Sequence, residues 1–351
     1  MKSINISPEV TIGAEAPPFL IAEIGINHNR DLTLADEMIA AAAEAGAHCV
    51  KFQNYLTEDF VADPKQQYSY ISSGKEVTES MFEMFKRYEV DRDFLEHTKA
   101  TCDQYGVIFT STPTNLNGIK DLVDLGAPLL KNGSDYLTNL EVVCQLGETG
   151  LPTILSCGMS TLANIDEAVR TFHETGNENL ILLHCTSCYP NPPEEAHLLK
   201  IPSLISAFEV PVGLSDHTDG SLAATLSTTL GATVIEKHFT TDRNLPGPDQ
   251  RFSSDPEEFA QLAKDIASAS LMMGSGKIGP TAGESTSLAE FRLSCVAAHD
   301  LPAGHLLTPA DITYKRPGTG IPPNAAQFIA GRTIKRPVAA NQLLAPKNFQ
   351  P

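Results

Sequence analysis

The sequence lacks long apolar runs. Nowhere among its 351 residues do about 20 apolar residues follow one another, the length that a membrane-spanning helix needs. The amino-terminal stretch also lacks the apolar core and the small-residue cleavage site of a secretory signal. These absences predict a cytoplasmic protein with no membrane partner.

Positive charge is also scarce. Lysine and arginine number 25 against 43 aspartates and glutamates, which gives a formal net charge of −18. A protein of this charge repels the phosphate backbone of nucleic acids, so we expect no nucleic-acid partner. If the substrate is an anion, its site must concentrate positive charge locally against this average field.

Paired cysteine motifs and glycine fingerprints are missing too. The seven scattered cysteines fit reduced, mostly buried thiols better than a disulfide framework. Residues 185–188 read CTSC, but no second C-x-x-C accompanies them to hold zinc, and we interpret them as packing residues. No G-x-G-x-x-G follows a predicted strand, which argues against a dinucleotide-binding fold.

What the sequence does contain is a regular alternation from Phe19 to about Gly274. Apolar, β-branched runs alternate with segments of helical period that often end at glycine. The predicted strands cover residues 19–26, 49–53, 107–112, 128–134, 153–159, 180–186, 210–218 and 233–240. Eight strands alternating with helices predict an α/β fold, a (β/α)₈ barrel within residues 1–274, rather than an open doubly wound sheet.

Helices are expected between these strands. The clearest helical patterns cover residues 32–46, 93–106, 116–126, 140–150, 163–176, 221–231 and 255–274. The last begins with Asp255 and Pro256, an N-cap followed by proline in the first helical position. The interval from Asn54 to Tyr88 is polar, rich in Tyr and Ser, and too long for a simple connection. We expect a loop here, and long loops of this kind commonly cover the active sites of barrels.

The composition changes after Gly274. Residues 275–291 are rich in Gly, Ser and Thr, and we interpret them as a linker. From residue 292 to residue 351, short apolar pieces are broken by turn signals. This pattern predicts a small β-rich domain of about sixty residues with little helix.

Every predicted strand ends in polar residues. In a barrel these ends meet at one rim, where catalytic groups lie. One such residue alone is as readily explained by a structural hydrogen bond, whereas contributions from all eight strands predict a site. The residues are Glu23, Lys51, Gln53, Ser111, Thr112, Lys131, Ser134, Ser156, Thr186, Ser215, Asp216, His217, Glu236 and His238.

Half of this rim is suited to an anion. Lys51 and Lys131 end apolar strands, where a lysine is unfavourable unless an anion meets it. Small hydroxyls, which donate readily to phosphate or carboxylate oxygens, are supplied by Thr112, Ser134, Ser156 and Ser215. This half predicts a pocket for a phosphorylated carboxylate.

Two successive strands end in histidine, His217 and His238. Each histidine alone is explained by a hydrogen-bonded loop position. Together, on neighbouring strands, they could bring two imidazoles to one cation and leave positions open for water and substrate. The pair therefore predicts a divalent-metal site beside the anion pocket.

Short motifs along the chain match those of a known family, in the family's order. They are IAEIGINHN, VKFQ, STP, ILSCGM, LLHCT with YP, GLSDHT, EKHFT, PGPD and KRPG. From about Phe19 onward the chain resembles the N-acetylneuraminate (sialic acid) synthases and the related legionaminic and pseudaminic acid synthases. The resemblance implies a (β/α)₈ TIM barrel followed by a small antifreeze-like (SAF) domain. It also implies a domain-swapped homodimer, in which the small domain of one chain covers the barrel of the other.

The resemblance further implies a reaction. Phosphoenolpyruvate and an open-chain N-acylhexosamine would give a nine-carbon 2-keto sugar acid and phosphate, with C–O cleavage of a tetrahedral intermediate. The sugar would be N-acetylmannosamine or a related 2,4-diacetamido-6-deoxy sugar. A divalent metal, Mn²⁺ with Mg²⁺ or Co²⁺ as alternatives, would be held by His217 and His238 and polarise the aldehyde.

Other roles follow from the same resemblance. Glu23 would position the aldehyde or transfer a proton. The residues implied for the phosphate of phosphoenolpyruvate are Lys51, Thr112, Ser134, Ser156 and Ser215. The carboxylate of phosphoenolpyruvate would bind to Lys131 and Tyr189. The sugar hydroxyls would bind to Gln53 and Asp249. The N-acyl group would meet Arg316 of the partner chain; without the resemblance, Arg316 is a solvated turn residue.

The chain departs from the family pattern at two places. Where sialic acid synthases usually carry a glutamate that takes part in proton transfer, Tyr136 stands here, and Asp135 replaces a glycine. A phenol titrates near about 10 and is a poor proton shuttle at neutral pH, though a usable donor, so Asp135 is the alternative group. Ser187 stands at a position where members of the family often carry asparagine. These changes leave the sugar and the proton-transfer scheme open.

Three other functions compete with the implied one. A synthase for a different nonulosonate would take its choice of sugar from residues 54–88 and from the small domain. A Schiff-base aldolase would use Lys131 or Lys237 as its nucleophile. A catalytically silent sugar binder would explain Tyr136 in place of an acid.

Overall fold

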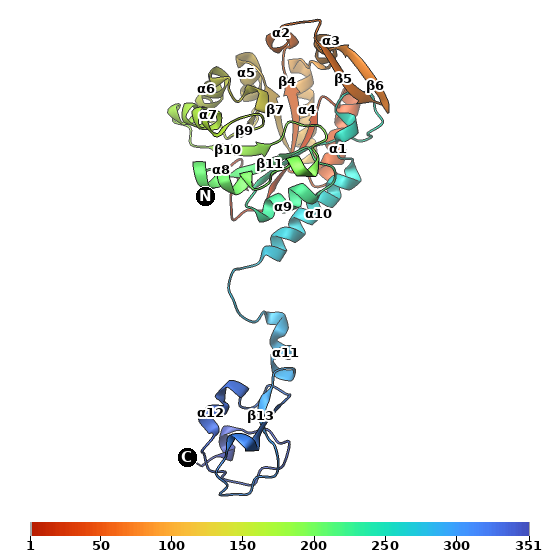
Figure 1. Cartoon of the computed structure of the whole chain (residues 1–351). Helices are drawn as coiled ribbons and strands as arrows, with labels where there is room; N and C mark the ends of the chain where they lie inside the picture. Colours follow the sequence, from red (N-terminus) through yellow and green to blue (C-terminus); the bar gives the residue numbers. More distant parts are fainter. Residues whose placement is uncertain (1, 351) are drawn as a thin grey trace. The chain divides into compact units, whose positions relative to one another are not determined.

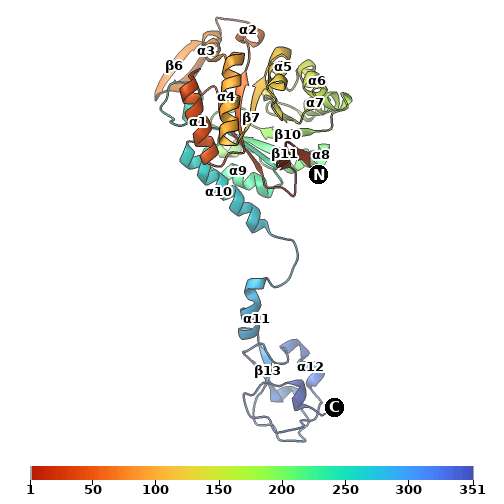
Figure 2. The same cartoon turned by 180° about the vertical axis from the view of Figure 1, so that it is seen from behind.

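The computed structural model describes residues 2–350, and the chain divides into two compact units at the boundary between Gly274 and Ser275. Figures 1 and 2 show the chain from opposite sides. Each unit is described here by itself. None of the described helices combines the length and the apolar character needed to cross a membrane.

Within residues 2–274, eight parallel strands form the barrel. They are β3 (Phe19–Gly25), β4 (Cys49–Asn54), β7 (Ile108–Pro113), β8 (Leu130–Asn132), β9 (Thr153–Ser156), β10 (Leu180–Cys185), β11 (Val212–Asp216) and β12 (Val234–His238). Sequential strands are neighbours, and the last strand pairs with the first, His238 opposite Glu23. At the seam between β7 and β8, the Thr110 hydroxyl donates to the Leu129 carbonyl at 2.8 Å. The predicted barrel is therefore confirmed.

Eight helices of the described chain follow the barrel strands and surround the ring (Figures 1 and 2). They are α1 (Leu32–Glu44), α4 (Arg92–Tyr105), α5 (Leu116–Asp124), α6 (Leu140–Glu148), α7 (Leu162–Glu174), α8 (Lys200–Phe208), α9 (Leu222–Thr229) and α10 (Pro256–Met273). The predicted N-cap of α10 is confirmed, since the Asp255 carboxylate accepts from the Glu258 amide at 2.9 Å. The sequence patterns did not single out α8, whose Pro202 is tolerated because it lies in the first turn.

Two layers of apolar side chains hold the barrel together. The larger layer packs strands against helices, and the smaller one fills the start of the ring. An amino-terminal hairpin, β1 (Ile4–Asn5) and β2 (Thr11–Ile12), packs Ile4 and Ile12 onto this smaller layer. The amino-terminal ends of the strands are thus filled with apolar side chains, which leaves the carboxyl ends for a site.

The long interval after β4 is an organised insert. It contains α2 (Thr57–Phe60), the antiparallel hairpin of β5 (Gln67–Ser72) and β6 (Lys75–Ser80), and α3 (Met81–Tyr88). Its own small core includes Tyr55 and Met84, packed with Ile26 from the end of β3. The sequence predicted a polar loop here, and the aromatic residues that build this core explain why it folds instead.

The second unit has little regular structure. It contains η4 (Ala282–Glu284), α11 (Ser285–Glu290), β13 (Ser294–Ala297), η5 (Pro309–Asp311), β14 (Ile312–Lys315), η6 (Pro323–Ala325), α12 (Ala326–Ile329) and η7 (Pro346–Asn348). Strands β13 and β14 pair antiparallel, and isolated bridges such as Leu301 with Val338 complete a small β-rich core. Residues 275–291, predicted as linker, include η4 and α11 because Thr281 and Glu284 form a capping box.

Candidate active site

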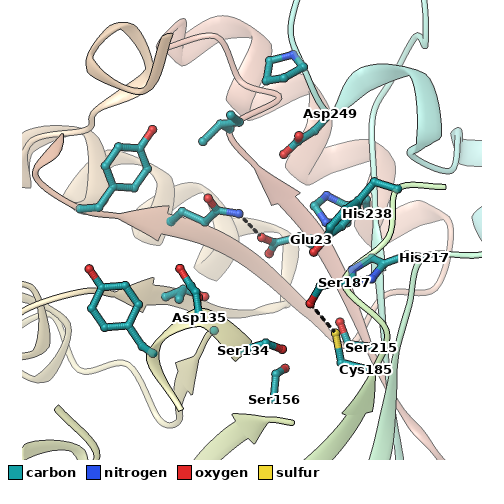
Figure 3. A pocket seen from close by; sticks show the side chains of 18 of the residues that line it. Glu23, Ser134, Asp135, Ser156, Cys185, Ser187, Ser215, His217, His238 and Asp249 are labelled. Atoms are coloured by element: carbon teal, nitrogen blue, oxygen red, sulfur yellow. Dashed lines mark hydrogen bonds between the residues drawn. The ribbon is translucent and has the colours of Figure 1, made fainter. Parts of the chain in front are cut away.

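A single cavity of about 620 Å³ lies at the carboxyl ends of the barrel strands and receives side chains from all eight of them. Every barrel residue to which the resemblance assigned a role in the condensation lines it. These residues are Glu23, Lys51, Gln53, Thr112, Lys131, Ser134, Asp135, Tyr136, Ser156, Tyr189, Ser215, His217, His238 and Asp249. Figure 3 shows Glu23, Asp249 and the two histidines on one side of the cavity, with Asp135 across from them.

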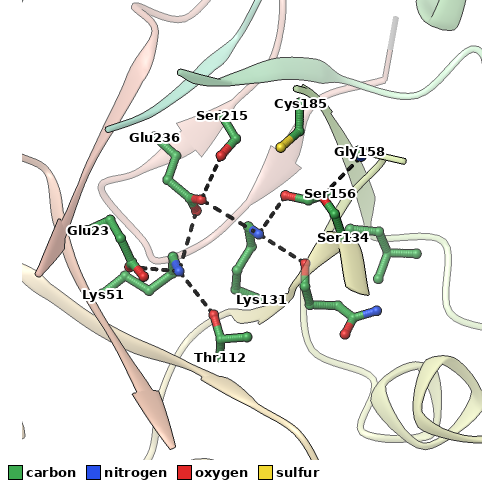
Figure 4. A network of polar contacts seen from close by, with 12 residues as sticks. Glu23, Lys51, Thr112, Lys131, Ser134, Ser156, Gly158, Cys185, Ser215 and Glu236 are labelled. Carbon is green, nitrogen blue, oxygen red and sulfur yellow. Dashed lines mark hydrogen bonds and ion pairs between the residues drawn. The ribbon is translucent and has the colours of Figure 1, made fainter. Parts of the chain in front are cut away.

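Two buried lysines organise the floor of the cavity (Figure 4). The Lys51 ammonium lies 2.7 Å from the Glu23 carboxylate and donates to the Thr112 hydroxyl at 3.0 Å. The Lys131 ammonium donates to the Ser156 hydroxyl at 2.6 Å. Hydroxyl groups therefore lie beside both cations, as the anion pocket requires.

Glu236 joins the two lysines. Its Oε2 lies 3.8 Å from Lys51 Nζ, its Oε1 lies 3.7 Å from Lys131 Nζ, and Oε1 also accepts from the Ser215 hydroxyl at 3.1 Å. The sequence placed Glu236 at a strand end but assigned it no role. Alternation along β12 puts Glu236 and His238 on one face, and this signal could have assigned Glu236 to the pocket.

Burial and charge oppose each other at this cluster. Burial favours neutral Lys51, but the carboxylates of Glu23 and Glu236 outweigh it and raise the pKa of Lys51. For Lys131, burial lowers the pKa by more than the charge of Glu236 raises it, so the pKa is lowered. Burial alone would raise the pKa of Glu236, but the charges of Lys131 and Lys51 hold it below the usual range. Burial, with the nearby charge of Glu236, raises the pKa of Glu23.

The two histidines lie side by side, with ring centroids 5.5 Å apart and ring planes inclined by 47°. Nδ1 of His217 lies 2.9 Å from the Thr186 carbonyl, so it carries the proton and leaves Nε2 with a lone pair. Nδ1 of His238 is buried without a hydrogen-bond partner. Burial lowers the pKa of His238 well below its ordinary value, which keeps the ring in the neutral form that binds metals.

This donor set fits a catalytic divalent cation. Among the described residues, no group of three or more His, Cys, Asp or Glu side chains forms a complete ligand set. Burial alone would lower the pKa of His217, but its contacts with Cys185 and the Thr186 carbonyl raise it, so this ring must release a proton when it binds a cation. The two imidazoles would leave the other coordination positions to water and substrate, which suits a Lewis acid better than a closed structural site. The ring of Tyr189 covers the pair, 4.2 Å from His217 between centroids.

Asp249 and Gln53 lie above this floor. Gln53 donates to the Glu23 carboxylate at 2.8 Å. Burial and the charge of Glu23 raise the pKa of Asp249 to about 7. The short helix η1 (Ser134–Tyr136) follows β8 and brings both Asp135 and Tyr136 to the cavity. Burial raises the pKa of Tyr136, which keeps the phenol protonated as a donor.

The cysteine prediction is confirmed in part. All seven cysteines are free, and five of them are buried. The assignment of Cys185 to packing was wrong, because it lines the cavity, with its thiol 3.9 Å from the Ser187 hydroxyl. Cys185 is the last residue of β10, and this strand-end position could have predicted that it lines the cavity.

Five other predicted residues do not line the cavity. The strand-end prediction was wrong for Ser111, Thr186 and Asp216. The Lys237 ammonium lies 2.8 Å from the Asp216 carboxylate and donates to the Thr218 carbonyl at 2.6 Å, which excludes it as a nucleophile in this pocket. Arg316 belongs to the second unit, where its exposed guanidinium stacks on the Phe291 ring at 5.3 Å. Its contact with the partner's substrate stays a prediction.

Comparison with known proteins identifies the family. The model described as NeuB family matches residues 38–278, and the SAF domain model matches residues 294–350. The chain belongs to the NeuB family. Its antifreeze-like second unit is therefore confirmed as a SAF domain.

Relatives in the NeuB family align along nearly the whole chain. The N,N'-diacetyllegionaminic acid synthase of Legionella pneumophila is 36% identical over 336 residues, 95% of this chain and 94% of that protein. The pseudaminic acid synthase of Helicobacter pylori is 31% identical over 336 residues, 95% of this chain and 98% of that protein.

A solved NeuB-family structure has the same fold. It is the N-acetylneuraminic acid (sialic acid) synthetase of Leptospira borgpetersenii in complex with citrate, with a TM-score of 0.74 and 32% identity. The match covers 82% of this chain and 95% of that one.

Proposed function

We propose that this NeuB-family chain condenses phosphoenolpyruvate with an open-chain N-acylhexosamine to give a nine-carbon 2-keto sugar acid and phosphate. One observation carries the proposal: two buried lysines with hydroxyl partners share a cavity with two adjacent imidazoles, those of His217 and His238. The names of the relatives, which are synthases of legionaminic, pseudaminic and sialic acids, support the same reaction.

The lysine cluster would bind phosphoenolpyruvate. Lys51 with the hydroxyls of Thr112, Ser134, Ser156 and Ser215 supplies donors for the phosphate, and Lys131 with Tyr189 supplies the carboxylate end. Glu236 holds both ammonium groups in place before substrate arrives, so little reorganisation is needed on binding. Glu23 and Glu236 balance the charge of the two lysines, so the pocket offers directed donors to the anion rather than an excess of positive charge.

His217 and His238 would hold the divalent metal, for which we propose Mn²⁺, with Mg²⁺ or Co²⁺ as alternatives. When bound, it supplies Lewis-acid polarisation of the sugar aldehyde. The protein would orient the sugar through Gln53 and Asp249, while Glu23 positions the aldehyde end beside Lys51.

The bonds balance without an external oxidant or reductant. C3 of phosphoenolpyruvate bonds to the aldehyde carbon, water adds at C2, and the C2–O bond to phosphate breaks as the ketone forms. The water gives up two protons as the ketone forms: one goes to the aldehyde oxygen and the other leaves with the phosphate. Asp135 and Tyr136 are the side chains proposed for this proton transfer, since they replace the family's usual glycine and glutamate.

The proposal is tested by measuring phosphate release from phosphoenolpyruvate with N-acetylmannosamine and with di-N-acetylated 6-deoxy sugars. His217→Ala should lower kcat about a hundredfold with a small change in the KM for phosphoenolpyruvate. Lys51→Ala should raise that KM about tenfold or more. Lys264→Ala on the exposed face of α10 is the control and should change neither constant. Equal, mild effects of both site variants would contradict the division of labour.

Lys131 keeps a Schiff-base aldolase as the second candidate, because burial lowers its pKa and favours the free amine. Borohydride trapping with pyruvate distinguishes the two functions. A covalent adduct at Lys131 would favour the aldolase, whereas loss of activity with a chelator and recovery with Mn²⁺ would favour the condensation. Sugar binding without any phosphate release would indicate a silent binder.

We also propose that the enzyme is a domain-swapped homodimer and that it is located in the cytoplasm. Arg316 would then reach the N-acyl group of the sugar bound to the partner's barrel. The free state of all seven cysteines supports a reducing compartment.

A further inference from the structure

One wall of the cavity is apolar, and the insert between β4 and α4 builds it. This wall, called here the apolar wall, consists of Tyr55, Phe60, Met81, Met84 and Phe85; Tyr68 of the same insert also lines the cavity. Its three rings meet edge to face, with centroids 5.3 Å apart for Tyr55 and Phe60 and 4.9 Å apart for Phe60 and Phe85. The Tyr55 hydroxyl donates to the Phe85 carbonyl at 3.1 Å, so this polar atom is already satisfied within the wall.

The apolar wall lies at the far end of the cavity from the lysine floor. Lys51, Gln53 and Tyr55 alternate along β4 and just beyond it, and all three line the cavity. A strand advances about 3.3 Å per residue, which puts Tyr55 roughly 13 Å along the chain from Lys51. Gln53 lies between these two residues on the strand, and Asp249 also lines the cavity.

This order of polar and apolar groups restricts the sugar. The aldehyde carbon C1 must meet phosphoenolpyruvate at the floor, so the C6 end of the open chain extends toward the apolar wall. A hydroxyl at C6 would lose water there against aromatic and thioether side chains, whereas a methyl group would gain by burial. The same holds for the methyl group of an acetamido substituent near that end.

We infer that the apolar wall makes the enzyme select a 6-deoxy sugar with a second acetamido group over N-acetylmannosamine. The inference rests on the proposed function and assigns Phe60, Met81 and Phe85 as its specificity-determining residues. All five residues of the apolar wall line the cavity, but these three are half-buried, whereas Tyr55 and Met84 are buried in the small core of the insert.

The test compares kcat/KM, measured by phosphate release, for N-acetylmannosamine and a 2,4-diacetamido-6-deoxy sugar of the same configuration at C2. Wild-type protein should favour the deoxy sugar by about tenfold or more, the discrimination that one apolar group provides. Met81→Gln keeps the length of the side chain and should reduce this ratio several-fold. Phe60→Gln serves as a second variant in case Met81→Gln unfolds. The KM for phosphoenolpyruvate should not change in either.

Ile71→Gln is the matched control, since Ile71 is an exposed apolar residue of the same insert that does not line the cavity. It should leave the sugar ratio at the wild-type value. Preference of the wild-type protein for N-acetylmannosamine, or an unchanged ratio in both folded wall variants, would overturn the inference but not the condensation. Absence of phosphate release with every sugar would overturn the proposed function, and this inference with it.

Discussion

Glu236 is the residue on which the charge balance of the pocket depends. It is buried and faces Lys51 and Lys131 at once, while Glu23 neutralises Lys51 from the other side. Two ammonium groups and two carboxylates therefore share a pocket that a dianionic substrate is proposed to enter. Such buried charges are tolerated only because each has an opposite partner.

Glu236→Gln should destabilise the fold. The amide keeps the shape but removes the charge that offsets the burial of Lys131, and breaking a buried pair of this kind lowers the free energy of unfolding by about 3 kcal/mol. Urea denaturation at pH 7 measures this change. Glu148→Gln on the exposed face of α6 is the control and should leave the free energy unchanged. Equal stability of the two variants would contradict the bridging role.

Asp249 should make stability depend on pH. Its pKa is raised to about 7 by burial and by Glu23, above the ordinary value of 3.8. Between these two values the native state holds a proton that the unfolded state has released, so this group makes stability fall as pH rises. In metal-free protein, the advantage of Asp249→Asn over wild type should grow from pH 4 to pH 7.5. The limit is about 4 kcal/mol, less where water in the open cavity screens the carboxylate.

Denaturation curves measured at each pH test this expectation. Asp166→Asn, an exposed carboxylate on α7, is the control and should run parallel to wild type. If the difference between Asp249→Asn and wild type stays constant across the range, the assigned pKa is wrong.

At the scale of elements, the insert does two things: it builds the apolar wall, and its hairpin tip holds the loop after β12. The Gly247 amide donates to the Ser72 hydroxyl at 3.1 Å, and the Ser73 hydroxyl donates to the Asn244 carbonyl at 3.0 Å. Because this loop carries Asp249, the insert also positions the carboxyl group that is proposed to contact the sugar.

Ser72→Ala should loosen the loop after β12. Loss of a hydrogen bond worth about 1 kcal/mol should speed amide hydrogen exchange at Gly247 about fivefold. Ser69→Ala is the matched control, since the Ser69 hydroxyl bonds only across the hairpin to Thr78 at 2.7 Å. Equal exchange at Gly247 in both variants would show that the tether does not hold the loop.

At the scale of the whole molecule, the proposed dimer makes one site from two chains. Arg316 lies in the SAF domain, whereas every other predicted site residue lies in the barrel. If the site is shared, two inactive chains can complement each other, because one mixed dimer contains one intact barrel faced by one intact arginine.

Mixing Arg316→Ala with Lys51→Ala protein, after joint unfolding and refolding, should therefore restore activity. With random pairing, half the dimers are mixed and each has one intact site, so about a quarter of wild-type activity should return. Each variant refolded alone is the control; at phosphoenolpyruvate concentrations far below the wild-type KM, it should show about a tenth of wild-type activity or less. No recovery in the mixture would indicate that each SAF domain serves its own barrel.

The sequence alone determined the barrel and the membership of its rim. Strand ends can be read from local periodicity, and in a parallel barrel all of them reach the same edge, so Lys51, Lys131 and the two histidines had to meet. The N-cap of α10 was equally local. The structure confirmed the fold and placed these residues in one cavity.

Only the tertiary structure decided which partners these residues have. The two carboxylates that face Lys51 come from strands β3 and β12, and the 5.5 Å between the histidine rings follows from closure of the ring. The insert was read as a polar loop because its apolar wall joins residues from Tyr55 to Phe85 across two short helices. Contacts of this kind depend on how distant segments pack, and the local periodicity of the sequence does not show that packing.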